Sequence, residues 1–113
     1  AEAKAKADAK AKADAKAKAD AKAKADAKAK ALAKAKEDAK TKELIALGIS
    51  VAQQCDGCIA SHARGAAMKG ATPQEVAETL GVAILMIGGP GTVYGPRAYD
   101  AFLEFHEKYA PKA

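Results

Sequence analysis

Residues 55–62 read Cys55-Asp56-Gly57-Cys58-Ile59-Ala60-Ser61-His62, and they contain both cysteines of the 113-residue chain. The sequence on either side favours helix, and Asp56-Gly57 is typical of an exposed turn. Because residues four apart share a helix face, we expect His62 one turn from Cys58. A thiol at a helix N-terminus faces unpaired N–H groups and the positive end of the dipole, which favour the reactive thiolate. The stretch therefore predicts a reactive thiol pair at the start of a helix, with Cys55 close enough to close a disulfide.

The remaining domain is predicted to be all-α, with no strand. A buried helix ends near Gln54 and a second one covers residues 55–69, so the two form a hairpin. A capping box at Thr72-Pro73-Gln74-Glu75 opens a third helix that continues to residue 87. We expect the glycine-rich run 88–91 to break it, and a last helix to follow, interrupted near Gly95-Pro96. The apolar positions that mark these helices are Leu44, Ile45, Leu47, Ile49, Val51, Val76, Leu80, Val82, Ile84, Met86, Ala98, Phe102, Leu103 and Phe105.

Residues 1–36 form a low-complexity segment, which we separate from a domain over residues 37–113. Within it the hexamer Ala-Lys-Ala-Lys-Ala-Asp repeats four times over residues 3–26. Ala and Lys favour helix, but a six-residue period spreads the charges round the cylinder and leaves no large apolar stripe to pack. We interpret this helical segment as engineered or simplified; a natural Lys-rich tail is the alternative.

The positive charge of the chain belongs to that segment. Residues 1–36 carry twelve Lys against five acids, a net of +7, whereas residues 37–113 carry a net of −2. No aromatic residue lies among the lysines, so they provide no stacking platform for single strands, and we expect no specific nucleic-acid partner. The longest strongly apolar run, residues 82–87, is too short to span a bilayer, and the first residues lack the apolar stretch of a signal peptide. We therefore expect a soluble, cytoplasmic protein with no membrane partner.

The pattern Glu43-x11-Cys55-x2-Cys58-x3-His62 resembles the active-site signature of the alkylhydroperoxidase AhpD / carboxymuconolactone decarboxylase superfamily. The flanks at residues 42–48, 81–83 and 88–90 resemble it too, and the resemblance covers about residues 40–107. It implies an AhpD-like helical domain that acts as a thiol-dependent peroxidase or disulfide oxidoreductase. It further implies that Cys58 attacks, Cys55 resolves, and His62 and Glu43 relay protons. No cofactor and no metal are implied.

The spacing of Glu43 is compatible with such a relay. At the rise of an α-helix, Glu43 lies about 18 Å before Cys55, and the returning helix brings His62 back by about 10 Å. Two long side chains or a bridging water can span the remaining offset of roughly 7–8 Å. Contact with a neighbouring subunit is a second way to bring Glu43 in, and a surface acid near a helix start is the third interpretation. The acid between the cysteines, Asp56, is expected to oppose thiolate formation.

Other interpretations of these residues stay open at this stage. Cys55, Cys58 and His62 could bind zinc with Glu43 or His106 as the fourth ligand, but structural zinc sites usually draw on two separated pairs. His106 otherwise reads as a surface residue on the last helix. Tyr94, Tyr99 and the run 88–91 are a hypothetical entrance to the thiols. The alternative to an enzyme is a non-enzymatic oligomeric scaffold on an AhpD-like core. A decarboxylase of the carboxymuconolactone type ranks third, since that branch normally lacks the cysteine pair.

The partners expected are those of a peroxidase cycle. The substrate is a hydroperoxide, and the reductant is an external dithiol, with lipoyl-bearing proteins filling that role in the family. The helix at residues 76–87 has more apolar surface than one small domain can cover. We therefore expect a homo-oligomer, a trimer or hexamer as in the superfamily.

Overall fold

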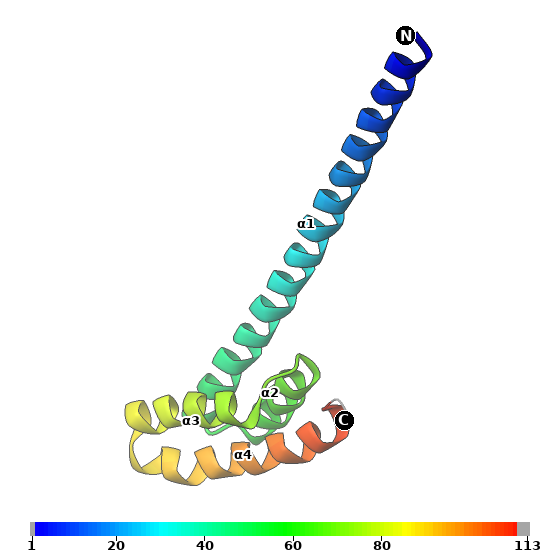
Figure 1. Ribbon diagram of the computed structural model, residues 1–113. Coiled ribbons are helices and arrows are strands. Elements are labelled where there is room, and N and C mark those ends of the chain that lie inside the picture. The colour runs from blue at the N-terminus through cyan, green and yellow to red at the C-terminus, as the bar shows by residue number, and fades with distance from the viewer. Residues whose placement is uncertain (1, 111–113) are drawn as a thin grey trace. The chain divides into compact units, whose positions relative to one another are not determined.

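The computed structural model describes residues 2–110 and contains four helices over that range (Figure 1). They are α1 (Glu2–Ala52), α2 (Asp56–Met68), α3 (Pro73–Ile87) and α4 (Gly89–Tyr109). The described part of the chain has no strand, so the predicted all-α class is confirmed. Two compact units can be separated, one up to Ala35 and one from Lys36 onward.

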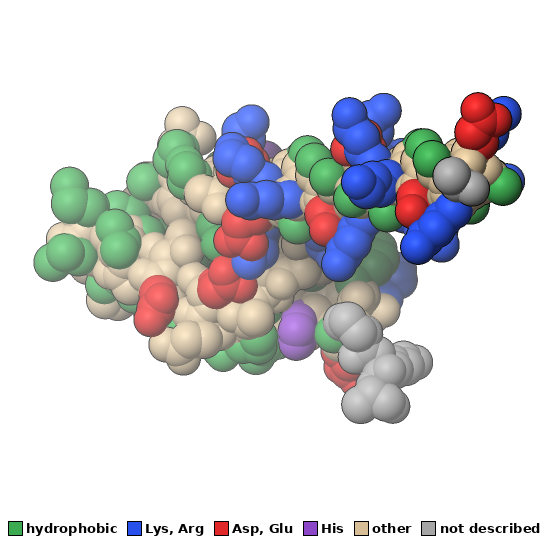
Figure 2. Space-filling view, turned by 45° about the horizontal axis from the view of Figure 1, so that its top comes forward, with side chains coloured by type: hydrophobic (Ala, Val, Ile, Leu, Met, Phe, Trp, Pro, Cys, Tyr) green, Lys and Arg blue, Asp and Glu red, His purple; other side chains and the backbone are tan. Residues whose placement is uncertain are grey.

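The first unit is helical and solvated. Every described residue from 2 to 38 is exposed, and even Leu32 keeps 62% of its surface in water. Charged side chains and Ala alternate along its visible face (Figure 2). This agrees with a repeat that favours helix by local preference but offers no apolar stripe to bury.

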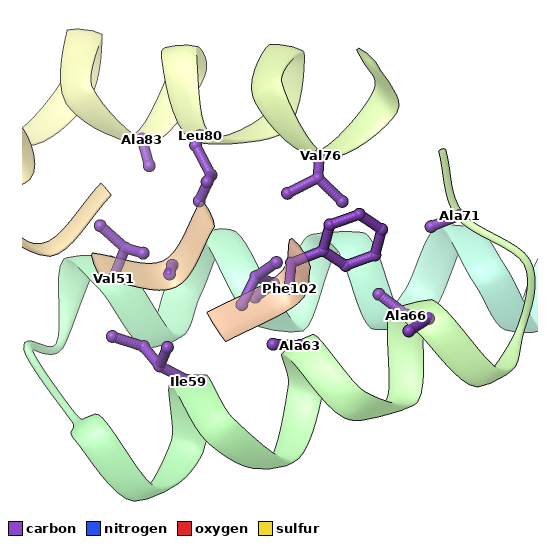
Figure 3. Packing of buried hydrophobic residues seen from close by; sticks show 12 residues of the cluster. Val51, Ile59, Ala63, Ala66, Ala71, Val76, Leu80, Ala83 and Phe102 are labelled. Atoms are coloured by element: carbon purple, nitrogen blue, oxygen red, sulfur yellow. The ribbon is translucent and has the colours of Figure 1, made fainter. Parts of the chain in front are cut away.

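The second unit is held together by a small core to which all four helices contribute (Figure 3). Helix α4 packs against both α2 and α3. Phe102 of α4 is fully buried among small side chains, and the Ala-rich α2 allows the helices to approach closely. The buried hydrophobic residues are Leu47, Val51, Ile59, Ala63, Ala66, Ala67, Ala71, Val76, Leu80, Ala83, Ala98 and Phe102.

The start of α3 is fixed by the predicted capping box. The Glu75 N–H donates to Thr72 Oγ1 at 3.1 Å, and the Thr72 N–H donates to Glu75 Oε1 at 3.0 Å. The ammonium of Lys40 on α1 lies 3.0 Å from Glu75 Oε2 and so ties α1 to this cap. The pKa of the Glu75 carboxyl lies below its ordinary value of 4.5, mainly because the carboxylate accepts the Thr72 backbone N–H. The hydrogen bond from Lys40 is the second cause.

The expected break of the third helix within residues 88–91 is confirmed at Gly88, whereas the expected interruption near Gly95-Pro96 was wrong. Only Gly88 separates α3 from α4, with a left-handed φ of 79°, and α4 runs through Pro96 without a break. The reason is packing. A Cβ on Gly91 would lie 2.8 Å from the Ile84 backbone, and one on Gly95 would lie 3.0 Å from the Ile84 side chain. These glycines therefore serve the close contact between α3 and α4 instead of ending a helix.

Candidate active site

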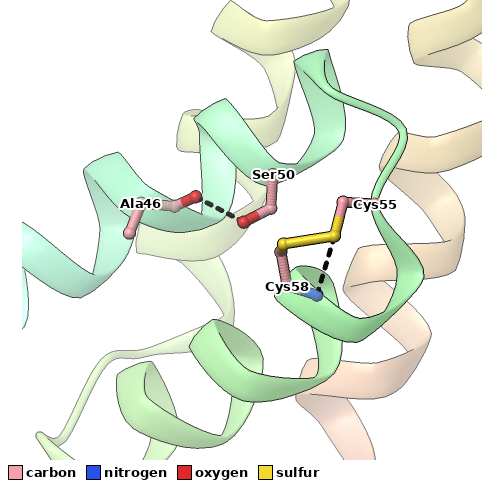
Figure 4. Close-up of a disulfide and its surroundings, with 4 residues drawn as sticks. All are labelled: Ala46, Ser50, Cys55 and Cys58. Carbon is pink, nitrogen blue, oxygen red and sulfur yellow. Dashed lines mark hydrogen bonds between the residues drawn. A yellow bond between two sulfur atoms is a disulfide. The ribbon is translucent and has the colours of Figure 1, made fainter.

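Cys55 and Cys58 form a disulfide across the first turn of α2, with 5.2 Å between their Cα atoms. Cys55 is the N-cap of the helix, and its Sγ accepts the Cys58 N–H at 3.2 Å (Figure 4). Both cysteines are partly buried, so neither is sealed in the core. The expectation of a thiol in the first helical turn agrees with this geometry. The role of Cys55 as the cap was not foreseen, because sulfur is not among the usual capping groups.

The end of α1 holds the cysteine pair in place. The Cys55 N–H donates to the Ser50 carbonyl at 3.2 Å, and the Ser50 hydroxyl donates to the Ala46 carbonyl at 2.6 Å. Ser50 is buried next to the disulfide (Figure 4). Gln54 adopts a left-handed φ of 56°, which reverses the chain between the two helices. The pair is therefore anchored to a helix terminus and not carried on a long loop.

Glu43 of α1 reaches His62 of α2 within one chain. Glu43 Oε2 lies 2.9 Å from His62 Nδ1, and the two side chains retain 29% and 37% of their surface exposure. The hairpin thus closes the offset calculated from the sequence. The carboxylate lies over Gly65, where a Cβ would come within 2.9 Å of both oxygens. A carboxylate on Nδ1 favours the tautomer with its proton there, which leaves Nε2 as the basic nitrogen.

The sulfur end of the relay is less direct. Across residues 2–110, no hydrogen bond links His62 to either sulfur of the disulfide. His62 lies four residues after Cys58 on α2, so both belong to the same helix face. A His62–Cys58 proton transfer stays a prediction about the reduced pair.

Arg97 was missed at the sequence level. Its Nη1 donates to Asp56 Oδ1 at 2.9 Å and to Oδ2 at 3.2 Å, which joins α4 to the residue between the cysteines. The guanidinium lies 4.7 Å above the ring centre of Tyr94. The Asp56 carboxylate raises the pKa of Arg97 above its ordinary value. An acid between two thiols indicates that a positive side chain lies nearby. The local sequence, however, could not identify Arg97, because it lies 41 residues away.

Two other residues considered for the site, His106 and Tyr99, pack against hydrophobic side chains of the core. His106 lies on the last helix as expected, and it is partly buried and stacks on Phe102, with 5.4 Å between ring centres. It lines a separate cavity of about 230 Å³ with Lys36 and Tyr109. Tyr99 packs against the core. Within residues 2–110, no three His, Cys, Asp or Glu side chains are grouped to share a metal ion.

An apolar groove of about 510 Å³ lies between the C-terminal part of α1 and α3. Met86, which lines the groove, and its neighbour Leu85 keep 77% and 80% of their surface exposed. Hydrophobic side chains gather on the left of Figure 2, the side on which α3 joins α4 in Figure 1. The groove is lined by Thr41, Leu44, Ile45, Gly48, Ile49, Ala52, Thr79, Val82, Ala83, Met86 and Ile87. None of the described helices combines the length and hydropathy needed to cross a bilayer.

Comparison with known proteins gives consistent matches. A model of the carboxymuconolactone decarboxylase family matches residues 19–107, a range that begins inside the Ala/Lys-rich segment. A crystal structure of the apo form of a carboxymuconolactone decarboxylase family protein from Legionella pneumophila is 44% identical, with a TM-score of 0.59. The match covers 68% of this chain and 73% of that one. An uncharacterized protein of Cupriavidus necator is 41% identical over 60 residues, which is 53% of either chain. The chain therefore spans about half the length of that curated relative.

Proposed function

Because this chain belongs to the carboxymuconolactone decarboxylase family, we propose that it is an AhpD-like thiol-dependent peroxidase and disulfide oxidoreductase. The observation that carries the proposal is a Cys55–Cys58 disulfide at the start of α2, one turn from a His62 that is hydrogen-bonded to Glu43. A vicinal pair of this kind can alternate between dithiol and disulfide. A carboxylate-oriented imidazole is a common device for activating a thiol.

In the proposed cycle His62 takes the proton from the Cys58 thiol, and Glu43 stabilises the imidazolium. The thiolate attacks the distal oxygen of a hydroperoxide, so the O–O bond breaks and Cys58 becomes a sulfenic acid. The leaving alkoxide takes a proton from His62 and departs as an alcohol. The Cys55 thiol then attacks the Cys58 sulfur, which releases water and forms the disulfide. An external dithiol reduces this disulfide by exchange and is itself oxidised.

The first test is a peroxide assay on the reduced chain. With cumene hydroperoxide and dihydrolipoamide, we expect sustained consumption by the wild type and background consumption by Cys58→Ser. Cys55→Ser is expected to accumulate a dimedone-reactive sulfenic acid after one turnover. Wild-type rates in Cys58→Ser, or no consumption by any form, would overturn the proposal. The second of these results would favour a non-enzymatic scaffold.

We also propose that a second copy of the chain covers the apolar groove between α1 and α3. The same surface carries a recess and, in Leu85 and Met86, a protruding apolar edge, so copies can interlock. Light scattering after size exclusion should give a trimer or hexamer, and Met86→Lys should lower the mass. Leu32→Lys, exposed but far from the groove in sequence, is the control. A wild type that is monomeric at tens of micromolar would contradict this.

A further inference from the structure

Asp56 occupies an unfavourable place for a redox thiol pair. It directly follows Cys55 and begins the helix whose third residue is Cys58. Consecutive Cα atoms are 3.8 Å apart, and the two cysteine Cα atoms are 5.2 Å apart, so Asp56 carries its charge in the same short turn that holds both cysteines. A bare negative charge at that range disfavours a thiolate.

Arg97 meets this charge from another helix. One guanidinium nitrogen contacts both Asp56 oxygens, at 2.9 and 3.2 Å. Tyr94, one turn earlier on α4, lies beneath the guanidinium, with 4.7 Å between Arg97 Cζ and the ring centre. The two partners are 50% and 67% exposed, and exposed ion pairs contribute little to folding. The ion pair therefore adds little to the stability of the fold. Its loss would, however, leave the negative charge of Asp56 uncompensated next to the cysteine pair.

We propose that Arg97 is a positioning residue that sets the reactivity of the Cys55–Cys58 pair by cancelling the charge of Asp56. The inference rests on the proposed function in so far as it treats Cys58 as a working thiol. The other titratable groups tied to this part of the chain are His62, four residues after Cys58 on α2, Glu43, which is hydrogen-bonded to His62, and Tyr94, which lies against the Arg97 guanidinium. Among the described residues, the hydrogen-bond and ion-pair partner of the Asp56 carboxylate is Arg97.

The size of the effect follows from charge and distance. A lone unit charge roughly 7 Å from a thiolate, in surroundings between protein surface and water, shifts its titration by about half to one pH unit. With Arg97 in place the net charge of the pair is zero. Arg97→Gln leaves −1, Asp56→Asn leaves +1, and the double variant returns to zero.

The experiment is a pH series of iodoacetamide alkylation on the reduced, full-length protein, read at each cysteine by mass spectrometry. We expect the midpoint for Cys58 to rise by about half to one pH unit in Arg97→Gln and to fall in Asp56→Asn. It should return to the wild-type value in the double variant and in Arg97→Lys. In 1 M NaCl the shifts should shrink, because the Debye length falls to about 3 Å. A packing defect would not show this order of midpoints or this dependence on salt.

A matched control exists in the other arginine of the chain. Arg64 lies on α2, is exposed, and donates to the Tyr109 hydroxyl at 3.3 Å. Arg64→Gln removes the same charge and should leave the midpoint within about 0.2 unit, since it is not paired to Asp56. Equal midpoints in all variants, or a double variant that stays at the Arg97→Gln value, would overturn the inference. The alkylation midpoints and their dependence on salt are measured without peroxide. Failure of this inference can therefore be told apart from failure of the proposed peroxidase activity.

Discussion

The contact between Glu43 and His62 can be measured as a coupling. The change is a double-variant cycle of Glu43→Gln and His62→Gln, in which both replacements keep a polar side chain of similar shape. The assay is a single turnover: reduced protein is mixed with cumene hydroperoxide, and disulfide formation is followed by mass spectrometry. Without an external reductant, the rate reports the steps at the cysteines alone.

The expected magnitude comes from the geometry of the pair. Exposed ion pairs contribute about 0.2–1 kcal/mol, and hydrogen bonds to charged groups about 1.5–3 kcal/mol. The 2.9 Å contact has side chains that are 29% and 37% exposed, which places it between these cases at about 1–1.5 kcal/mol. Glu43→Gln should therefore slow disulfide formation about 5- to 10-fold. His62→Gln should slow it about 10²- to 10⁴-fold, the usual effect of losing a general base.

If Glu43 acts through His62, the double variant will be as slow as His62→Gln alone, within about twofold. The coupling free energy then equals the whole effect of Glu43→Gln, about 1–1.5 kcal/mol. Additive effects, with Glu43→Gln equally costly when His62 is absent, would refute the relay. Circular dichroism of each variant checks that the helices are retained.

Three further predictions concern stability and the shape of the site. Phe102→Ala removes a fully buried ring and should lower the free energy of unfolding in urea by about 3–5 kcal/mol. Glu75 has a lowered folded-state pKa, so its stabilisation is present above its ordinary value of 4.5 and is lost as pH falls below it. Glu75→Gln should thus be less stable than wild type at pH 7, with a difference that shrinks as the pH falls from 4.5 through the lowered folded-state pKa. Gly65→Ala places a methyl group against the Glu43 carboxylate and should slow single-turnover disulfide formation as Glu43→Gln does.

Each of these has a control in the same chain. Gly81→Ala adds a methyl group to the interior of α3 where nothing lies within 4 Å, so it should leave single-turnover rates unchanged. Leu103→Ala truncates a side chain of α4 that stays 37% exposed, and it should cost much less than Phe102→Ala. Glu78→Gln, one turn after Glu75, removes a carboxylate that is not part of the capping box, and it should change stability at pH 7 less than Glu75→Gln does. Matching effects in a control would contradict the reason given for its partner.

The sequence alone was sufficient for what depends on local spacing. The capping box at Thr72 and Glu75 involves groups three residues apart, and the placement of Cys58 in a first helical turn needs only the turn signal before it. The repeat of residues 3–26 likewise predicts a solvated helix, because helix preference and the lack of an apolar stripe are both local properties. The reach from Glu43 to His62 was also within range, since the rise of two antiparallel helices joined by a short turn determines it.

Only the tertiary structure decided what depends on contacts between distant segments. Gly91 and Gly95 read as helix breakers from their intrinsic preference, but their missing Cβ atoms make room for Ile84, so the close packing of α3 and α4 outweighs that preference. Arg97 cancels Asp56 from 41 residues away, and His106 turns onto Phe102. A sequence specifies which charges and rings exist, while the packing of helices determines which of them meet.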